Sequence, residues 1–493
     1  MQRIALVAFA TTVALLMGSF ACAENSSSDR PNVILILVDD LGWKDLGCQG
    51  SEYYETPHID ALAAGGMRFT QGYAACAVCS PTRAAVLTGK YPGRLGITDW
   101  IRGRRGRKSK IFEAAQRGEF VSNKGRPLLT PANRFALPLE EVTLAERLKE
   151  VGYTTCHVGK WHLGDPGQWP TDQGFDINIG GCDFGSPPSY FDPYANRRSP
   201  DGIPTLPPRN KGEYLADREA DEAANFIKQH QDEPFFLSYW PYEVHTPIQG
   251  KPELIAHYKK KPKTEQSNPE YAAMVHAMDA AVGRITKALE KYDLTEETLI
   301  VFTADNGGLA TIKRLDGPTN NAPLRSGKGY PYEGGLRVPF IVSWPGVIEA
   351  GSTSGEAVCS IDVTPTICEA VGVEIPESAT IDGLSLWPHL TSAGQDAIDR
   401  DTLIWHFPHY RRPDVVPYSV IRQGPWKLIK RYEGPTFELY NLAKDPYEDH
   451  DLAAKRPGTV KSLDEELRDR LTDMGAKIPY VADKNAASSS NGS

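Results

Sequence analysis

The stretch NVILILVDD, residues 32–40, decides the fold class, because a continuous apolar run leads directly into two aspartates. A strand that is apolar at every position, rather than at alternate ones, is typical of a parallel sheet covered by helices on both faces. The run TLIVFT at residues 298–303 leads in the same way to Asp305 and Asn306. We therefore predict an α/β protein with a mostly parallel central sheet, in which both polar pairs lie at the carboxyl edge.

Further apolar runs alternate with helical patterns along the chain, as expected for helices that flank a sheet. We expect strands at 153–158, 235–240 and 338–343, helices at 143–151, 213–230 and 269–292, and another helix that begins at Pro57. Past residue 401, short strand patterns separated by turns predict a small antiparallel sheet, and a helix follows at 459–474. The predicted organisation is a signal peptide (1–23), a main domain (24–395), a C-terminal subdomain (396–480) and a disordered tail (481–493).

The composition is that of an ordinary globular protein, with 40% apolar residues and a net charge of −9 over 493 residues. This acidity argues against nucleic acid and anionic membranes as general partners. One segment, residues 102–126, opposes the trend, since it carries nine Lys and Arg against two Glu. It is either a solvated insertion or a binding surface for a polyanion other than nucleic acid.

The N-terminus has the three parts of a secretory signal peptide: a positive end, an apolar run and a small-residue cleavage site at Ala21-Cys22-Ala23. We therefore expect an exported protein, periplasmic or secreted. Lipoprotein anchoring through Cys22 is the less favoured alternative, because Ser19 stands where such sites usually carry an aliphatic residue. No other stretch is long and apolar enough to be a membrane span.

Removal of the signal peptide leaves seven cysteines, an odd number that sets one thiol apart in an exported protein. With Cys79 set aside, the other cysteines either form disulfides or are small buried apolar side chains. These are Cys48, Cys76, Cys156, Cys182, Cys359 and Cys368.

The two polar pairs at the strand ends predict a cation site. They bring together Asp39, Asp40, Asp305 and Asn306. Carboxylates held side by side repel one another unless a cation lies between them. Three carboxylates and an amide oxygen suit Ca²⁺, with Mg²⁺ as the alternative, better than zinc, which prefers His and Cys.

The segment CSPTRAAVLTG, residues 79–89, predicts a short helix with Ser80 as its cap, Pro81 at its first position and a glycine past its end. Cys79 then lies at the N-terminal mouth of the helix, where free N–H groups attract an anion. Arg83 follows one turn later on the same side. A thiol is a soft ligand, poorly matched to a hard cation in the same site.

These residues resemble those of a known family. Residues 79–83, CSPTR, match the C-x-P-x-R signature of the type I sulfatases, the formylglycine-dependent group with an alkaline-phosphatase-like fold. Other similar blocks, in the order of that family, are NVILILVDD (32–40), TPHIDALAAGGMRF (56–69), GKWHLG (159–164), HTP (245–247), TADNG (303–307) and KGYPYEGGLRVP (328–339). The resemblance covers about residues 30–450 and extends to exported enzymes of the arylsulfatase and N-acetylgalactosamine-sulfatase kind.

The resemblance implies that Cys79 is the precursor of formylglycine. The hydrated aldehyde has one hydroxyl that can bind the cation and attack sulfur, and a second that can expel sulfate. The implied cation ligands are Asp39, Asp40, the modified Cys79, Asp305 and Asn306. The modification requires a maturation partner, either a formylglycine-generating enzyme or an anaerobic sulfatase-maturating enzyme.

The same resemblance assigns the remaining catalytic roles. Arg83, Lys160 and Lys328 are expected to neutralise and orient the anionic sulfate. His245, together with Lys328, is expected to protonate the departing alcohol, and His162 to accept the proton when sulfate is released. For the contact with sulfate that many members place after the GKWHLG block, this chain offers Ser186 or Ser189 without a clear choice.

The expected substrate is a sulfated glycan, a polysaccharide or its oligosaccharides, with galactose-type sugars favoured by the family likeness. His406, His409 and Arg411, at the start of the subdomain, are the candidate contacts to the leaving group. One alternative is a phosphodiesterase or phosphonate hydrolase of the same fold, which turnover of matched sulfate and phosphate esters would separate. The other is a non-catalytic glycan-binding relative, against which the intact set of catalytic residues argues.

Overall fold

The structure is a computed structural model that describes residues 30–103, 109–312, 315–411, 414–434 and 436–481. The predicted signal peptide and Cys22 lie outside the described residues, as does the predicted tail apart from Val481, which belongs to a strand. Among the helices that the structure describes, none combines the length and the apolar character that a membrane crossing requires.

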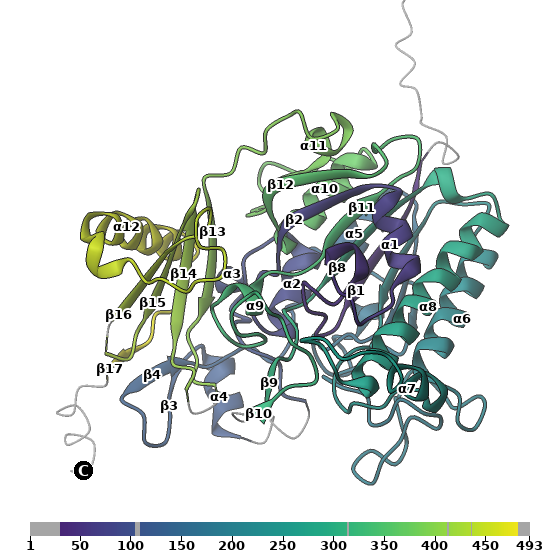
Figure 1. Ribbon diagram of the computed structural model, residues 1–493, viewed down its shortest axis with the longest axis horizontal. Coiled ribbons are helices and arrows are strands. Elements are labelled where there is room, and N and C mark those ends of the chain that lie inside the picture. Colours follow the sequence, from purple (N-terminus) through teal and green to yellow (C-terminus); the bar gives the residue numbers. More distant parts are fainter. Residues whose placement is uncertain (1–29, 104–108, 313–314, 412–413, 435, 482–493) are drawn as a thin grey trace, which may run out of the picture.

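The centre of the molecule is an eight-stranded sheet (Figure 1). In spatial order its strands are β12 (Ser352–Cys359), β2 (Met67–Tyr73), β11 (Phe340–Ser343), β8 (Thr298–Ala304), β1 (Asn32–Val38), β7 (Phe235–Trp240), β5 (Thr154–Gly159) and β6 (Ile177–Ile179). Strand β1 runs parallel to both β7 and β8, and only β11 is antiparallel to its neighbours. The predicted mostly parallel α/β sheet is confirmed.

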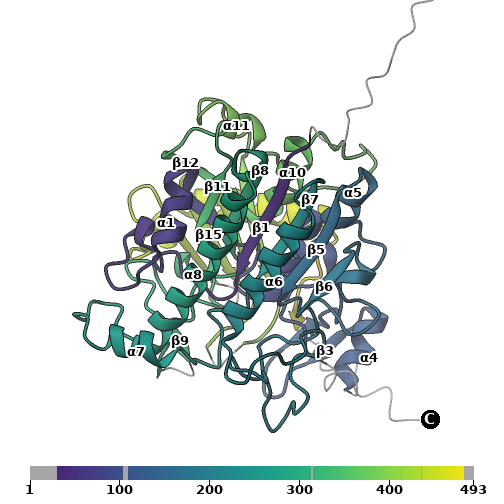
Figure 2. The same cartoon turned by 90° about the vertical axis from the view of Figure 1, so that its right-hand side faces the viewer.

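Helices cover both faces of this sheet, which explains the unbroken apolar run of β1. Ile34, Ile36 and Val38 belong to one core, which they share with α1 (Pro57–Ala64), α6 (Leu215–Gln229) and α8 (Pro269–Lys291). Val33, Leu35 and Leu37 point to a second core, shared with α2 (Cys79–Thr88), α5 (Leu144–Glu150) and α10 (Val363–Ala370). Figure 2 shows α6 and α8 side by side across the sheet. Every β1 side chain is therefore buried, whichever face it occupies.

A second, antiparallel sheet lies to one side of the central sheet, on the left in Figure 1. Its four strands are β13 (Thr402–Phe407), β14 (Tyr418–Gln423), β15 (Trp426–Arg431) and β16 (Thr436–Asn441), and α12 (Pro457–Asp473) packs against it. The predicted antiparallel sheet and its helix are thus present. A three-stranded sheet consists of β3 (Phe120–Ser122), β4 (Leu128–Pro131) and β17 (Tyr480–Val481).

The two large sheets share a core and a buried ionic contact. Tyr73 at the end of β2 and Cys359 of β12 belong to the same apolar cluster as the inner side chains of β13 to β16. Beside it, the Lys427 ammonium on β15 lies 2.9 Å from a Glu333 carboxylate oxygen and 2.8 Å from one of Glu448. All three side chains are at most 1% exposed, so the contact is inside the joint between the sheets.

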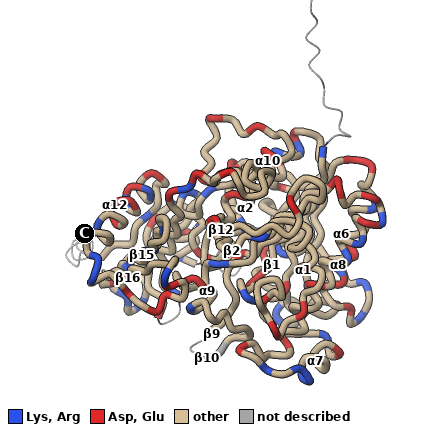
Figure 3. The backbone as a smooth tube through the Cα atoms, turned by 45° about the horizontal axis from the view of Figure 1, so that its top comes forward, with Lys and Arg blue, Asp and Glu red and all other residues tan. Residues whose placement is uncertain are grey.

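The remaining elements are short. They are α3 (Pro92–Leu95), α4 (Lys110–Arg117), α7 (Pro252–Tyr258), α9 (Glu333–Leu336), α11 (Trp387–Thr391), β9 (Thr311–Ile312) and β10 (Leu315–Asp316). Both basic and acidic residues occur along the outer helices α6, α8 and α12 (Figure 3), and ion pairs between residues four apart, such as Arg218–Glu222 and Arg470–Glu466, lie within α6 and α12. The cysteines at 48, 76, 79, 156, 182, 359 and 368 are all free. Of the six candidates for disulfides, five are buried side chains, and Cys48 is partly exposed.

Candidate active site

The two polar pairs meet at the carboxyl edge of the central sheet, as predicted. Val38 at the end of β1 is in register with Ala304 at the end of β8, which places Asp39 beside Asp305. The Asp40 backbone turns away from the strand with a φ of 60° and donates its N–H to an Asp305 carboxylate oxygen at 3.2 Å. All three carboxylates and Asn306 are 0–1% exposed. Parallel neighbouring strands thus bring residues 265 positions apart into one buried cluster.

Three oxygens of this cluster lack a hydrogen-bond partner in the described part of the chain: Asp39 Oδ1, Asp40 Oδ2 and Asn306 Oδ1. A buried oxygen without a partner is unfavourable unless something else binds it. Carboxylate and amide oxygens are the donors that Ca²⁺ and Mg²⁺ prefer. The ligand atoms of Asp39, Asp40 and His245 also lie within 4.8 Å of one another. The residues present therefore fit a hard divalent cation.

Three cationic side chains surround the acidic cluster. Lys160 Nζ lies 2.6 Å from Asp39 Oδ2, and Lys328 Nζ lies 2.5 Å from Asp40 Oδ1. Arg83 reaches Asp305 Oδ2 through Nε at 2.9 Å and Nη2 at 2.8 Å. Its guanidinium also lies 5.3 Å from the centre of the Trp240 ring, which helps to fix its orientation. Arg83, Lys160 and Lys328 are brought together as the resemblance implied.

The charges shift the acidity of the cluster. Burial alone would raise the pKa of the Asp40 carboxyl, but Lys328 and His245 hold this pKa well below its usual range. Burial likewise opposes ionisation of Asp305, whose pKa is nevertheless lowered by Arg83 and Lys160. Burial raises the pKa of Asp39 well above its usual range despite Lys160, and the carboxylates of Asp305 and Asp40 add to that rise. Asp39 is thus the carboxylate of the cluster whose ionised form would be stabilised most by a further positive charge.

Cys79 is the first residue of α2, and His162 lies against its sulfur. The distance from Cys79 Sγ to His162 Nδ1 is 3.4 Å, and His162 Nε2 lies 2.7 Å from the Ile101 carbonyl oxygen. A carbonyl only accepts hydrogen bonds, so Nε2 carries the ring proton and Nδ1 presents a lone pair to residue 79. Burial, followed by the nearby Lys160, lowers the pKa of His162 well below its usual value, which keeps the ring neutral.

The start of α2 differs from the prediction. The helix begins at Cys79 with Val78 as its N-cap, so Ser80 is inside the first turn rather than at the cap. The Ser80 hydroxyl instead donates to the His162 carbonyl and accepts the Ile101 N–H, both at 3.0 Å. Ser80 was misassigned because a serine before proline is typical of a cap, whereas these partners come from distant loops. It holds those two loops against the helix that carries Cys79.

His245 lies on the other side of Asp40. Its Nε2 is 3.6 Å from Asp40 Oδ2, and its Nδ1 is 2.9 Å from the Thr246 carbonyl oxygen, to which it must donate. The neutral ring therefore has no proton on Nε2. Burial and Lys328 lower the pKa of His245 to about 3. Lys328, whose pKa is raised by Asp40 in spite of its burial, keeps its proton and lies beside the same carboxylate.

The three predicted leaving-group contacts are not gathered at one place. His406 is buried, with Nδ1 2.6 Å from the Ser419 hydroxyl and Nε2 3.2 Å from the Lys477 carbonyl. His409 Nε2 lies 2.7 Å from the Thr98 hydroxyl. Arg411 approaches the catalytic cluster most closely, since its side chain packs over Gly329, the residue after Lys328. Its Nε and Nη1 are buried without a hydrogen-bond partner among the described residues.

A cavity of about 780 Å³ opens beside His162. Its walls include Arg102, the first basic residue of the segment 102–126, and Trp100 and Arg198, which the sequence patterns did not single out. Ser186 also lines it, whereas the Ser189 hydroxyl donates to the Phe191 carbonyl at 3.2 Å. These wall residues come from irregular loops, where no periodicity marks them. In the sequence, Trp100 is marked only as a large aromatic residue; the structure shows that it is 39% exposed and directly precedes Ile101, whose carbonyl contacts His162.

Comparisons with known proteins agree with this geometry. A family model described as Sulfatase matches residues 31–373, and one described as N-sulphoglucosamine sulphohydrolase, C-terminal, matches residues 327–477. A sulfatase of Formosa agariphila is 31% identical over 94% of this chain and 91% of its own length. Arylsulfatase A of Homo sapiens is 32% identical over 89% of this chain and 86% of its own. The crystal structure of Ps i-CgsB in complex with k-i-k-neocarrahexaose has a TM-score of 0.74 and 28% identity, covering 93% of this chain and 96% of that one.

Proposed function

Because this chain belongs to the sulfatase family, with the alkaline-phosphatase-like fold, and is a sulfuric ester hydrolase, we propose that it removes O-sulfate from a sulfated carbohydrate, with residue 79 acting as formylglycine. The expected substrate is a polysaccharide or its oligosaccharides. The observation that carries the proposal is the position of Cys79: its sulfur faces the His162 lone pair, and it begins the helix whose Arg83 reaches Asp305 in the acidic cluster.

That position suits a hydroxyl better than a thiol. Asp39, Asp40, Asp305 and Asn306 would hold Ca²⁺, or Mg²⁺ in its place, with the modified residue 79 as a further ligand. A bound divalent cation supplies positive charge to a sulfate oxygen and lowers the pKa of a coordinated hydroxyl. A thiol in the same place would be a soft ligand at a hard cation.

The fixed cations of the chain provide the rest of the positive charge. Arg83 and Lys160 are fully buried, and Lys328 is 5% exposed, so their charges act with little screening by water. Their carboxylate partners hold them in place before substrate arrives. A sulfate group stays anionic throughout hydrolysis, so preorganised cations of this kind stabilise it without reorganisation during the reaction.

Two proton transfers are assigned to neighbouring side chains. His162 Nδ1 faces residue 79 and is the base that takes up a hydroxyl proton when sulfate is released. The departing sugar oxygen takes its proton from His245 or Lys328, which flank Asp40. In the neutral His245 ring the proton is on the far nitrogen, so the geometry favours Lys328 unless substrate binding reprotonates the imidazole.

The cavity beside His162 is suited to a carbohydrate leaving group. Trp100 offers an aromatic face, and Arg102 and Arg198 offer charges for further anionic groups. The solved relative Ps i-CgsB was crystallised with a neocarrahexaose, which supports a sulfated galactan as the first substrate to test. Of the three leaving-group candidates from the sequence, Arg411 is proposed to contact this substrate directly, because its side chain packs over Gly329, next to Lys328, and its ion pair with Asp99 is a long one of 3.7 Å.

The N-terminal signal supports export to the periplasm or the medium, and the formylglycine requires a maturation enzyme in the producing cell. Release of inorganic sulfate from carrageenan oligosaccharides is the experiment that tests the function, with Cys79→Ala as the inactive control. Matched sulfate and phosphate esters of one phenol test the phosphoryl-transfer alternative. Turnover of the phosphate ester above the sulfate ester, or of aryl sulfates with no sulfated carbohydrate, would overturn the proposal.

A further inference from the structure

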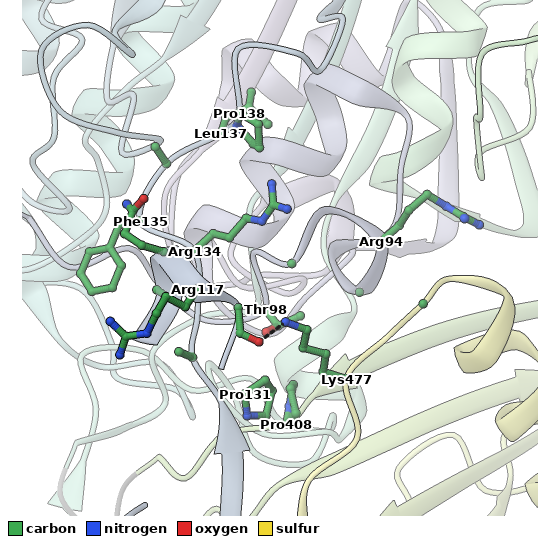
Figure 4. Close-up of a pocket in the computed structure, with 18 of the residues that line it drawn as sticks. Arg94, Thr98, Arg117, Pro131, Arg134, Phe135, Leu137, Pro138, Pro408 and Lys477 are labelled. Atoms are coloured by element: carbon green, nitrogen blue, oxygen red, sulfur yellow. Dashed lines mark hydrogen bonds between the residues drawn. The ribbon is translucent and has the colours of Figure 1, made fainter. Parts of the chain in front are cut away.

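A second cavity, of about 570 Å³, lies between the main domain and the C-terminal segment. Figure 4 shows its labelled side chains: Arg94, Arg117 and Arg134 come from the N-terminal part of the chain, and Lys477 from the segment that follows α12. The volume is within the range of sites that hold small ligands. None of the catalytic residues named above lines this cavity.

The wall of this cavity is basic. Four of its lining side chains carry a positive charge, and no Asp or Glu is among its described lining residues. Arg94 is neutralised by Asp382 at 2.7 Å and Asp473 at 3.1 Å, and Arg117 by Glu119 at 2.6 Å. Arg134 forms no hydrogen bond or ion pair through its side chain with any residue that the structure describes. Among the residues that the structure describes, the Lys477 ammonium donates to the Gly118 carbonyl, at 2.5 Å, and has no carboxylate partner. Two uncompensated cations therefore face one cavity in a protein whose net charge is −9.

Apolar surface alternates with this charge. Phe135, Leu137 and three prolines, at 131, 138 and 408, line the same cavity. The CH faces of a sugar pack against such side chains, while sulfate groups on its rim take hydrogen bonds from guanidinium and ammonium groups. His406 also lines the cavity, and burial lowers its pKa to about 4, so it presents a neutral ring.

This cavity is connected to the active site through one short segment. Gly96 and Thr98 line it, and Ile101, three residues further on, holds His162 through its carbonyl. A small cavity lies between the two large ones. It shares Phe135 with the basic cavity and Trp100 and Arg102 with the cavity beside His162. These shared wall residues mark the path that a chain of several sugars would follow from the cavity beside His162 to the basic cavity.

We propose that the basic cavity is a remote subsite that binds a second sulfate group of the same oligosaccharide, with Arg134 and Lys477 as its charged contacts. The assignment rests on the proposed function, because it names the substrate as a chain with sulfates on more than one sugar. It also gives His406 a place in substrate binding, as part of the wall of this subsite rather than next to the cation cluster.

The test measures binding, so that turnover and the subsite are judged separately. In the Cys79→Ala background, calorimetry compares a carrageenan hexasaccharide with galactose monosulfate. Arg134→Glu is expected to weaken hexasaccharide binding by about tenfold or more and to leave the monosaccharide unchanged. Lys287→Glu makes the same charge change on the exposed face of α8 and is expected to alter neither.

Equal hexasaccharide affinity in the Arg134→Glu and Lys287→Glu proteins would overturn the subsite. Should Arg134→Glu fail to fold, Lys477→Gln is the second variant. It is expected to weaken hexasaccharide binding by a smaller factor, because it removes a charge without reversing it, and to leave monosaccharide binding unchanged. The proposed function fails in a different way, if the unmutated enzyme hydrolyses aryl sulfates but releases no sulfate from any sulfated carbohydrate.

Discussion

His162 contacts Cys79 with one ring nitrogen and the Ile101 carbonyl with the other, at 3.4 Å and 2.7 Å. The second contact fixes the tautomer, so the lone pair on Nδ1 points at residue 79 whether or not substrate is present. In the proposed function, this base takes up a proton when sulfate is released rather than in the first displacement.

Replacing His162 with alanine is therefore expected to separate the two steps. The variant should release about one equivalent of alcohol per active site rapidly and then turn over 10²- to 10⁴-fold more slowly, roughly the contribution of a positioned base. Stopped-flow assays with a chromogenic aryl sulfate measure both phases. His276→Gln, on the partly exposed face of α8, should behave like the unmutated enzyme. A variant with normal steady-state turnover would refute the role of His162.

Formylglycine at residue 79 predicts a mass change. In protein from a host with a maturation enzyme, the peptide that contains Cys79 is expected to be about 18 Da lighter than its sequence mass, because the thiol is replaced by an aldehyde. Peptides that contain Cys48 or Cys156 should keep their sequence mass. The occupancy of the modification should rise in proportion to specific activity across preparations. Full activity in a preparation with an unmodified thiol would exclude the proposed nucleophile.

The partnerless oxygens of Asp39, Asp40 and Asn306 predict that a divalent cation stabilises the fold. Chelation should lower both the activity and the Tm, and Ca²⁺ should restore them. At a hundred times its Kd, a bound cation adds about 2.7 kcal/mol to the free energy of unfolding. Asp40→Asn should weaken the response of Tm to Ca²⁺. Asp45→Asn removes an equally buried carboxylate that already has hydrogen-bond partners, so its response to Ca²⁺ should persist.

Asp279 predicts a pH dependence of stability. Its carboxylate accepts the Ile59 N–H at 2.8 Å near the start of α1, yet burial raises its pKa from 3.8 to about 7. A raised carboxyl pKa means that the folded state binds the proton more tightly than the unfolded state. The resulting stability is complete below about pH 4 and is lost as the pH rises through 7.

The asparagine of the Asp279→Asn variant cannot ionise, so this variant should not lose stability in this way as the pH rises. The difference in stability between variant and unmutated protein is expected to shift in favour of the variant by roughly 2–4 kcal/mol between pH 4 and pH 8. Thermal unfolding of both proteins across this range measures it. Asp396→Asn, at an exposed loop position, controls for the change of charge. A constant gap between the two Tm curves would show that Asp279 is ionised throughout.

The sequence alone was enough to predict those elements whose local residue pattern follows the same physical rule as their packing in the folded protein. The apolar run of β1 could only be a strand buried on both faces, and acids at the ends of two such strands could only meet at one edge. The direction of β11 was not predictable, because its four buried residues look the same in either orientation and the connection decides. The partners of Ser80 come from irregular loops, and Trp100 and Arg134 lie in such loops themselves; where a loop comes to lie depends on the folded core rather than on neighbouring residues.

The Lys427 contact has a consequence for how such chains can be recombined. The lysine belongs to the C-terminal sheet, but its partner Glu333 opens α9, five residues after Lys328. An exchange of C-terminal halves that cuts the chain just before β13 and brings in no lysine at this place would leave the buried Glu333 carboxylate with the more distant Arg337, 3.9 Å away, at a penalty of up to about 3–5 kcal/mol. A crossover before residue 328 would transfer lysine, glutamate and catalytic loop together. The segment that can be exchanged as one unit therefore begins before residue 328 and is larger than the C-terminal antiparallel sheet.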